Sequence, residues 1–266
     1  MQNYLIFLFL GKKVALEKRI GRPVLNYHQT DSTNLEAWRL LRRGKAGEGM
    51  VIVAGSQSKG RGQAGAHWES EPGKNLLLSV VLAPHFLPPE QQFQLSKAVS
   101  LALHDAVREF LPGKTVHIKW PNDLYVGHSK VAGILIENAI AGSRLEHAIA
   151  GIGLNVNQRT FAKDLPNPTS LALEAGHEFD LMVCLELLLE KLDRRYKALR
   201  REDTRVLDKA YLEHLWGYRR EMEYLSDDRP FKASIEGLDP YGRLMLRDTT
   251  GKEKAYDMKE VRLVSP

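Results

Sequence analysis

The sequence lacks the features that define several classes of protein. It has one cysteine, so no disulfide can form within the chain, and a reducing, cytoplasmic location is expected. The histidines are scattered, with no HxxxH or Cys/His cluster, so we expect no metal site built by the protein alone. The N-terminal apolar run from Tyr4 to Leu10 is too short to cross a bilayer and lacks a signal peptide's basic start and cleavage site. It predicts a strand or an extension packed on the body, and no membrane association.

The overall composition is that of a globular protein. Apolar residues make up 43% and charged residues 27% of 266 residues, enough for one large core with a small satellite domain. The formal net charge of +5 suits a protein that handles phosphates or meets an acidic partner. A generally basic surface explains the same charge equally well.

The apolar periodicity predicts alternating strands and helices. "VLNYHQ" at 24–29 reads as a strand, and the next segment as a helix that ends near Gly44, with Thr33 and Glu36 as a capping box. Residues 157–168, which are polar and rich in Asn and Pro, predict a mobile loop. The other predicted elements are strands at 49–55 and 75–82, a helix over 90–110, three β-rich runs between 116 and 157, and two or three helices within 169–215.

The pattern changes at Trp216. From there, short strand-like runs alternate with turn sequences such as "GLDPYG", which is typical of a small β-barrel. We therefore predict an α+β protein with a mixed β-sheet flanked by helices. Its expected parts are an N-terminal extension (1–23), a main domain (24–215) and a C-terminal barrel (216–266).

A glycine-rich loop, "GRGQAG", occupies residues 60–65 and matches the spacing of a dinucleotide-binding fingerprint. A strand enters the loop, but Pro72 and Gly73 and then another strand follow it, so no helix receives a pyrophosphate. The glycines could still aim backbone N–H groups at an anion beside the charge of Arg61. A plain surface loop remains the alternative. "PGKT" at 112–115 is no phosphate-binding P-loop, because Arg108 stands where its first glycine must be.

Two further stretches carry polar groups. "DSTN" at 31–34 could cap a helix, contact a polar ligand, or do both. In "KWPND" at 119–123, the proline ends a strand and places Asn122 and Asp123 in a tight turn, with Lys119 before it and Lys130 after it. The turn is either a hairpin with solvated lysines or the site where a lysine and a carboxylate enter one cleft.

In this order, the stretches "DSTN", "QSKGRGQAGAHWESEPGKNLLLS", "KWPNDLYV…KVAGILIE" and "GIGLNVN" resemble the biotin protein ligases. The resemblance runs from about residue 24 to the C-terminus, where "IEGLDPYGRLML" looks like the family's SH3-like domain. It implies the biotin/lipoate ligase fold and a two-step reaction. ATP and biotin give biotinyl-5′-adenylate with Mg²⁺ as cofactor, and a lysine of a biotin carboxyl carrier domain, such as an acetyl-CoA carboxylase subunit, then takes the biotinyl group.

The resemblance also implies roles for particular residues. Arg61 and Lys130 would stabilise charge on the α-phosphate, and Asp123 would act on the incoming amine as a base or orienting group. Apolar walls would come from Trp68 and the Ala132-Gly133-Ile134 segment. Asn155 would lie near the nucleotide, with the 157–168 segment closing over the adenylate. The remaining expected contacts with biotin or adenylate are Ser32, Thr33, Asn34, Gln57, Gly60, Gly62, Gln63, Lys119 and Asn122.

The chain departs from the family pattern at one place. Many members have further arginines after the GRG sequence, where Gln63, Ala64 and Ala66 stand here. Only 30 residues precede "DSTN", so we expect no DNA-binding module and no repressor function.

Alternatives remain at this stage. A lipoate or octanoyl ligase or transferase is thought to share the fold, and motifs alone do not separate the two substrates. A nucleic-acid-binding module is disfavoured, because acidic residues such as Asp227, Asp228 and Glu236 mix with basic ones in the C-terminal segment. A homodimer paired through a sheet edge is left open, and the sequence does not identify the carrier protein.

Overall fold

The structure is a computed structural model that describes residues 5–6, 20–163, 165–201 and 204–264. Leu5–Ile6 form strand β1, which pairs antiparallel with β2. The rest of the predicted Tyr4–Leu10 segment lies outside the described residues.

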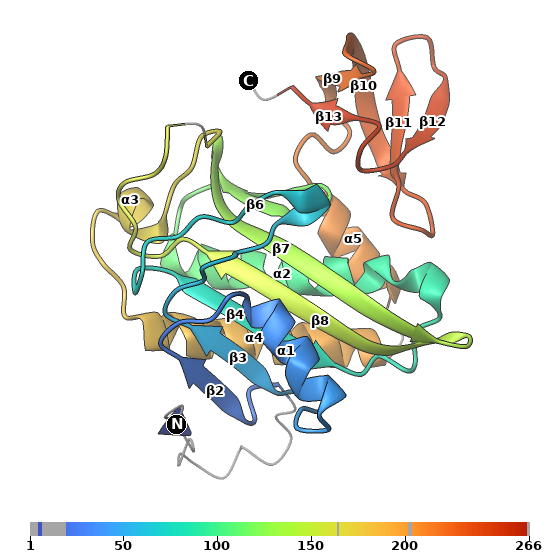
Figure 1. Ribbon diagram of the computed structural model, residues 1–266. Helices are drawn as coiled ribbons and strands as arrows, with labels where there is room; N and C mark the ends of the chain where they lie inside the picture. The colour runs from blue at the N-terminus through green and yellow to red at the C-terminus, as the bar shows by residue number, and fades with distance from the viewer. Residues whose placement is uncertain (1–4, 7–19, 164, 202–203, 265–266) are drawn as a thin grey trace.

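The centre of the molecule is a mixed eight-stranded sheet with the strand order β1-β2-β3-β4-β8-β7-β6-β5. Strands β2 and β3 are parallel and the other neighbours antiparallel, which confirms the predicted mixed sheet. β7 and β8 form a long hairpin across the middle (Figure 1). The strands that follow β1 are β2 (Val24–Tyr27), β3 (Val51–Ala54), β4 (Leu76–Leu82), β5 (Val116–Lys119), β6 (Asp123–Val126), β7 (Ser129–Ala141) and β8 (Arg144–Leu154).

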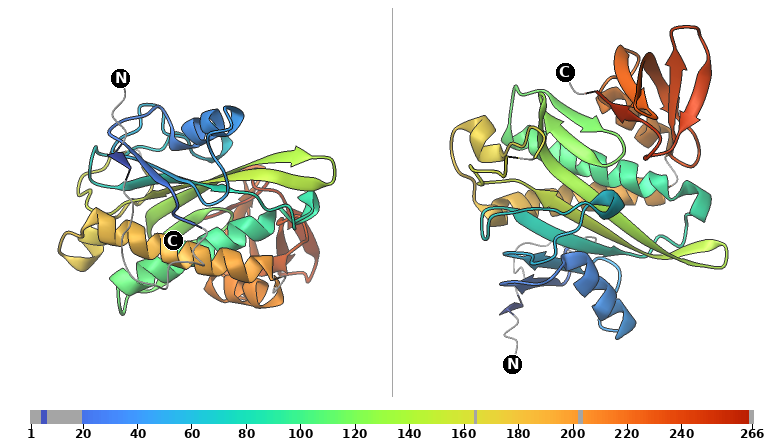
Figure 2. Two further views of the ribbon diagram at one scale, coloured as in Figure 1. Left: turned by 90° about the horizontal axis from the view of Figure 1, so that it is seen from below. Right: turned by 45° about the horizontal axis from the view of Figure 1, so that its top comes forward.

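Helices cover both faces of this sheet. Helix α1 lies on one face, and α2 and α4 lie side by side on the other (Figures 1 and 2). The helices are α1 (Thr33–Arg42), α2 (Phe93–Phe110), α3 (Leu171–Ala175), α4 (Leu181–Arg200) and α5 (Thr204–His214), with short 3₁₀ turns η2 (Gln63–Gly65) and η3 (Pro89–Gln91). Among the described residues, no helix is both long and apolar enough to span a membrane.

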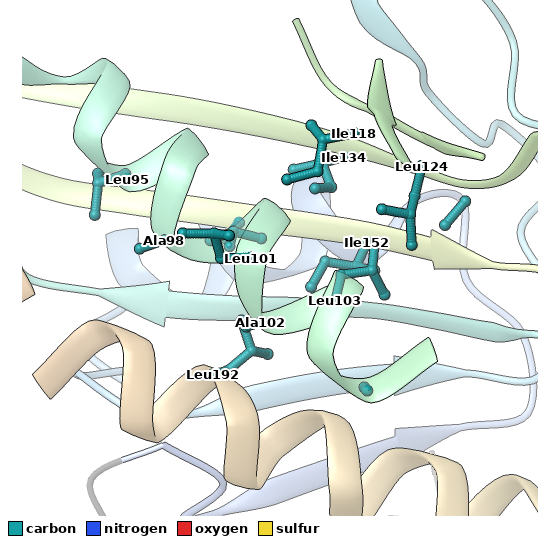
Figure 3. Packing of buried hydrophobic residues seen from close by; sticks show 14 of the residues in the cluster. Leu95, Ala98, Leu101, Ala102, Leu103, Ile118, Leu124, Ile134, Ile152 and Leu192 are labelled. Carbon is teal, nitrogen blue, oxygen red and sulfur yellow. The ribbon is translucent and has the colours of Figure 1, made fainter. Parts of the chain in front are cut away.

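The two faces of the sheet differ because side chains alternate along a strand. Toward α2 and α4, β8 directs Ala150, Ile152 and Leu154 into a continuous hydrophobic core, part of which Figure 3 shows. On the α1 face the same strand has Gly151 and Gly153 instead, so a space can form above it. The core on one face therefore fixes the strands that form the floor of the site on the other.

Three predicted details are wrong or incomplete. The Thr33–Glu36 capping box does not form: Ser32 is the N-cap residue without a side-chain cap bond, and the Glu36 carboxylate accepts a hydrogen bond from Tyr27. Asp123 belongs to strand β6, which the turn prediction missed, because only pairing with β5 and β7 makes this short segment a strand. The strand-like runs predicted near 218–224, 231–236, 243–247 and 253–257 also leave out Arg262–Leu263, which form the short strand β13.

The C-terminal segment forms a second, antiparallel sheet with the order β12-β11-β10-β9-β13, seen at the upper right of Figure 1. This sheet fits an SH3-like domain, although among the described residues no pairing joins β12 to β13 to close a barrel. The proposed boundary at 215/216 falls between α5 and β9. The strands are β9 (Glu221–Ser226), β10 (Arg229–Leu238), β11 (Leu244–Asp248), β12 (Glu253–Tyr256) and β13 (Arg262–Leu263).

A turn of the second sheet holds the segment that carries KWPND. The indole Nε1 of Trp120 donates a hydrogen bond of 2.9 Å to the carbonyl oxygen of Gly242. Gly242 has a φ of +86°, and a Cβ there would lie 2.2 Å from Cγ of Phe93 at the start of α2. Glycine is therefore required at position 242 both for the backbone conformation and for the close contact between this turn and Phe93 of α2.

We predict that Gly242→Ala lowers the free energy of unfolding by about 3 kcal/mol or more, since strain and overlap with Phe93 add. Gly251→Ala is a matched control with a φ of +88° and no atom within 4 Å of the added Cβ. It should cost only about 1–2 kcal/mol of strain. Urea denaturation of both variants measures the difference, and equal losses would show that the contact with Phe93 does not matter.

Candidate active site

A pocket of about 250 Å³ opens on the α1 face of the large sheet. One water occupies about 30 Å³ in the liquid, so the space suits a small molecule rather than a single solvent molecule. Of the residues predicted for the site, all line the pocket except Gly60, Lys119, Ala132 and Asn155. The lining residues are Ser32, Thr33, Asn34, Gln57, Arg61, Gly62, Gln63, Ala66, His67, Trp68, Leu78, Asn122, Asp123, Lys130, Gly133, Ile134, Leu135, Gly151, Ile152 and Gly153.

The floor of the pocket is made of strand glycines. Gly133 of β7 pairs directly with Gly153 of β8, and the ring of Trp68 lies on both. A Cβ at Gly153 would lie 2.4 Å from this ring, and one at Gly133 2.9 Å from it. At Gly151 a Cβ would lie 2.3 Å from the Asn34 side chain. The bare backbone at these positions is what allows an aromatic ring and an amide to lie against the sheet.

The flanking side chains of "AGIL" do not form the pocket wall as predicted. Ala132 is buried in the main core on the opposite face. Ile134 borders the pocket, but its side chain belongs to the same core (Figure 3). Gly133 faces the other way because side chains alternate along β7. The apolar part of the wall is therefore Trp68 with the glycine backbone and Leu135, which β7 carries on the same face as Gly133.

The glycine-rich loop folds back on itself over the floor. The Trp68 amide donates to the Gly60 carbonyl at 3.1 Å, and the Gly62 amide to the Ala66 carbonyl at 2.7 Å. A Cβ at Gly60 would lie 2.3 Å from the Trp68 carbonyl oxygen, so Gly60 serves this close backbone approach rather than the pocket. Arg61 reaches across to β7, where its Nη1 lies 3.0 Å from Oε1 of Glu137.

The polar end of the pocket is a hydrogen-bonded cluster from three elements. Oε1 of Gln57 accepts from the Thr33 amide at 2.7 Å and lies 3.2 Å from the Thr33 hydroxyl. On β4, the Ser79 hydroxyl lies 2.7 Å from Oγ1 of Thr33 and 2.6 Å from Oδ1 of Asn34. Thr33 and Asn34 are buried in the first turn of α1. These groups are positioned before any ligand arrives.

The charged end carries Lys130 and Asp123, which stand on neighbouring strands β7 and β6. Lys130 Nζ lies 2.7 Å from Oδ1 of Asp123 and 5.7 Å from the centre of the Trp68 ring. Oδ1 of Asp123 accepts no well-directed hydrogen bond from the described residues, so this ion pair alone compensates it. The side chain of Asn122 donates to the Ile134 carbonyl at 2.8 Å and holds the turn against β7.

Two further predicted site residues, Lys119 and Asn155, lie outside the pocket. Lys119 is cross-strand neighbour to Asp123, but its ammonium lies 5.1 Å from the ring centre of Tyr125 and 5.8 Å from that of Trp216. Burial lowers the pKa of the Lys119 ammonium; the charge of Asp123 opposes this shift, and that of Lys130 adds to it. Lys119 thus faces the C-terminal sheet rather than the pocket.

Asn155 is the second. It is buried, and its side chain donates to the Thr169 carbonyl at 2.9 Å. The backbone around Thr169 is hydrogen-bonded to that of Lys130. The Thr169 amide donates to the Lys130 carbonyl, and the Lys130 amide donates to the Asn167 carbonyl. Asn155 therefore holds the end of the 157–168 segment beside Lys130. The described residues of this segment form no helix or strand, but the first two, Asn157 and Gln158, are buried and hydrogen-bonded.

Several functional positions escaped the sequence analysis. Gly151 and Gly153 stand in the quoted "GIGLNVN" block, where alternate glycines in an apolar strand were a usable signal. Ser79 gave a weaker signal, as the one polar residue of an apolar strand, and Glu137 gave a weaker signal still, because other polar residues stand on β7. His67 and Ala66 line the pocket only because the loop folds back.

The site suits a reaction of an anion beside a small polar ligand. It combines Lys130 and Asp123 at one end with the uncharged hydrogen-bonding groups of Thr33, Asn34, Gln57 and Ser79 at the other, where the Arg61–Glu137 ion pair adjoins Asn34. Nowhere in the described ranges do three His, Cys, Asp or Glu side chains gather in a way that could hold a metal ion.

Comparisons with known proteins agree with this chemistry. Residues 27–155 match the model of the Biotin/lipoate A/B protein ligase family. The biotin–[acetyl-CoA-carboxylase] ligase of Paracoccus denitrificans is 31% identical over 85% of this chain and 94% of its own length. The bifunctional ligase/repressor BirA of Bacillus subtilis is 29% identical over 92% of this chain and 75% of its own.

A solved structure gives the same answer at the level of the fold. The biotin protein ligase from Aquifex aeolicus in complex with biotin and ATP superposes with a TM-score of 0.75 at 26% identity. The match covers 91% of this chain and 99% of that one. With the pocket and the sequence likeness to the Paracoccus enzyme, it shows that the chain belongs to the biotin protein ligase family.

Proposed function

We propose that this chain is an ATP-dependent ligase that activates biotin as biotinyl-5′-adenylate and transfers it to a lysine of a biotin carboxyl carrier protein. The observation that carries the proposal is one pocket with the hydrogen-bonding groups around Asn34 at one end and Lys130 with Asp123 at the other, joined by a glycine floor under Trp68. Biotin has the matching form: a ring with a cyclic urea at one end and a carboxylate at the other.

In the first step, an oxygen of the biotin carboxylate attacks the α-phosphorus of ATP, and the bond to the β-phosphate oxygen breaks to release pyrophosphate. Negative charge grows on the α-phosphate oxygens. Arg61 and Lys130 are the two pocket cations positioned to stabilise it, since fixed charges aimed at developing charge lower the barrier. Each must first exchange its carboxylate partner, Glu137 or Asp123, for the substrate.

In the second step, the lysine amine of the carrier attacks the acyl carbon, and the bond from this carbon to the adenylate oxygen breaks. The amine must lose a proton to be nucleophilic. Asp123 stands at the cationic end with an oxygen held only by Lys130, so it can accept or orient that proton.

Magnesium fits this site only through the nucleotide. The carboxylates of Asp123 in the pocket and of Glu137 beside it are already paired with Lys130 and Arg61, and the described residues offer no cluster of three ligands. Mg²⁺ in nucleotide sites is held largely by the substrate's phosphates and water. When bound there it would neutralise the phosphates that leave as pyrophosphate.

The lone cysteine is consistent with a reducing compartment, the cytoplasm in this proposal. Cys184 is buried in α4, and burial raises the pKa of its thiol to about 12, so it is chemically inert.

Pyrophosphate exchange into ATP tests the proposed function and separates it from lipoate activation. With purified protein and Mg²⁺, exchange is expected in the presence of biotin and not with lipoate. Exchange with lipoate alone would assign the pocket to the other branch of the family. The absence of exchange with either acid from folded protein would contradict adenylation itself.

Replacing either pocket cation should slow adenylation. Arg61→Ala and Lys130→Ala are each expected to reduce the rate of biotin-dependent exchange by a factor on the order of a hundred. Lys114→Ala is the matched control, since Lys114 pairs with Glu174 outside the pocket and its loss should leave the rate unchanged. Wild-type rates in both pocket variants would remove these roles while leaving the fold intact.

Asp123→Asn should separate the two steps. The amide keeps the shape of the side chain but cannot take a proton, so transfer to the carrier should fall by about a hundredfold and adenylation by less than tenfold. Single-turnover transfer from preformed adenylate measures the second step alone. Equal losses in both steps would mean that Asp123 acts only by holding Lys130.

A further inference from the structure

Glu137 uses both carboxylate oxygens within the site without lining the pocket. It stands on β7 on the same face as Gly133, with 24% of its side chain exposed. Oε1 accepts from Arg61 Nη1 at 3.0 Å, and Oε2 accepts from Asn34 Nδ2 at 2.8 Å. One residue thus ties the glycine-rich loop to the first turn of α1.

The contact with Glu137 fixes which way the Asn34 amide points. Nδ2 of Asn34 also donates to the Leu135 carbonyl, at 3.3 Å. An ionised carboxylate and a carbonyl only accept hydrogen bonds, so the NH₂ group must face both of them. The amide oxygen is then the only part of Asn34 with hydrogen-bonding capacity to spare, because its two N–H donors are used.

The orientation of the Asn34 amide also fixes the directions in which the neighbouring hydroxyls of Ser79 and Thr33 donate. Oδ1 of Asn34 can only accept, so the proton in its 2.6 Å contact comes from Ser79. A hydroxyl carries one proton, so Thr33 must supply its own to Ser79, 2.7 Å away, or to Oε1 of Gln57, 3.2 Å away. In either case the proton of Thr33 is spent inside the cluster, and its oxygen lone pairs remain.

We propose that Glu137 is a specificity-determining positioning residue: through Asn34 and Ser79 it leaves the Asn34 amide oxygen and the Thr33 hydroxyl as hydrogen-bond acceptors at the polar end of the pocket. Such a pocket selects a ring that carries N–H donors, as a cyclic urea does, over a dithiolane ring, which has none. The inference rests on the proposed function and specifies how that pocket recognises its acid. Asn34 is 3% exposed, so a ligand that left its acceptor unpaired would lose a buried hydrogen bond.

Biotin binding without ATP tests this role apart from catalysis. By isothermal titration calorimetry, Glu137→Gln should raise the Kd for biotin about tenfold, because a glutamine amide can donate and so lets Asn34 turn over. Asn34→Ala should weaken binding by a similar factor. If Glu137 acts through Asn34, adding Glu137→Gln to Asn34→Ala should change the Kd by less than about twofold.

The controls separate this role from a general effect of surface charge, from the loop contact with Arg61 and from a loss of folding. Glu146→Gln, an exposed change on the partner strand β8, should leave the Kd unchanged. Arg61→Ala reports the loop contact alone and should shift the Kd less than Glu137→Gln does. Circular dichroism and melting temperature establish folding. If Glu137→Gln does not fold, Ser79→Ala breaks the same chain and should also weaken binding about tenfold.

Wild-type affinity in Glu137→Gln, or in Ser79→Ala when that variant stands in, would overturn the inference. The inference would also be overturned if the increases in Kd from Glu137→Gln and Asn34→Ala multiplied in the double variant. An increase in Kd from Arg61→Ala as large as that from Glu137→Gln would do the same. Wild-type protein that binds no biotin would instead overturn the proposed function, and this inference with it.

Discussion

The site depends on one constraint: three positions on one face of two neighbouring strands have no side chain. Gly133, Gly151 and Gly153 leave the backbone of β7 and β8 bare on the α1 face. Trp68 and Asn34 occupy that space, and a single methyl group at these glycines would lie within 3 Å of them. The glycine-rich loop and α1 can therefore approach the sheet closely, which brings the polar and cationic ends of the pocket together.

Strand glycines normally weaken a sheet, and here the opposite face offsets that cost. Ile134, Ile152 and Leu154 on the same strands are buried against the helical layer. The core thus holds β7 and β8 in register, and the register decides which residues face the pocket. A slip of one position would exchange the glycines for these apolar side chains.

Electrostatics impose a second condition on the pocket. Both cations placed at the reaction are paired with carboxylates, Arg61 with Glu137 and Lys130 with Asp123. The pairs hold the side chains in place, but an anionic substrate has to compete with a carboxylate for each. The loop has few spare charges for that competition, because Gln63, Ala64 and Ala66 stand where many family members carry arginines.

Sequence reasoning identified the mixed sheet, the helices and most of the pocket. Its successes came from local signals: apolar periodicity for α2 and β4, and the blocks that contain Arg61, Asp123 and Lys130. One group of errors concerned the direction in which a side chain points. Lys119 adjoins the pocket in sequence but faces Trp216, since the direction of its side chain depends on packing that only the fold reveals.

Tertiary contacts explain the other errors. Asn155 supports a neighbouring segment because Thr169 returns beside it, and Thr33 does not cap α1 because Gln57 and Ser79 surround its hydroxyl. The register that places Glu137 beside Asn34, 103 positions earlier, is likewise a property of the folded sheet.

A crystal structure with biotin and a non-hydrolysable ATP analogue would test the central claim most directly. The account predicts the cyclic urea against Asn34 and Thr33, and the acid and the α-phosphate beside Lys130 and Arg61. Biotin bound elsewhere, for example near Lys119 and Trp216, would contradict it.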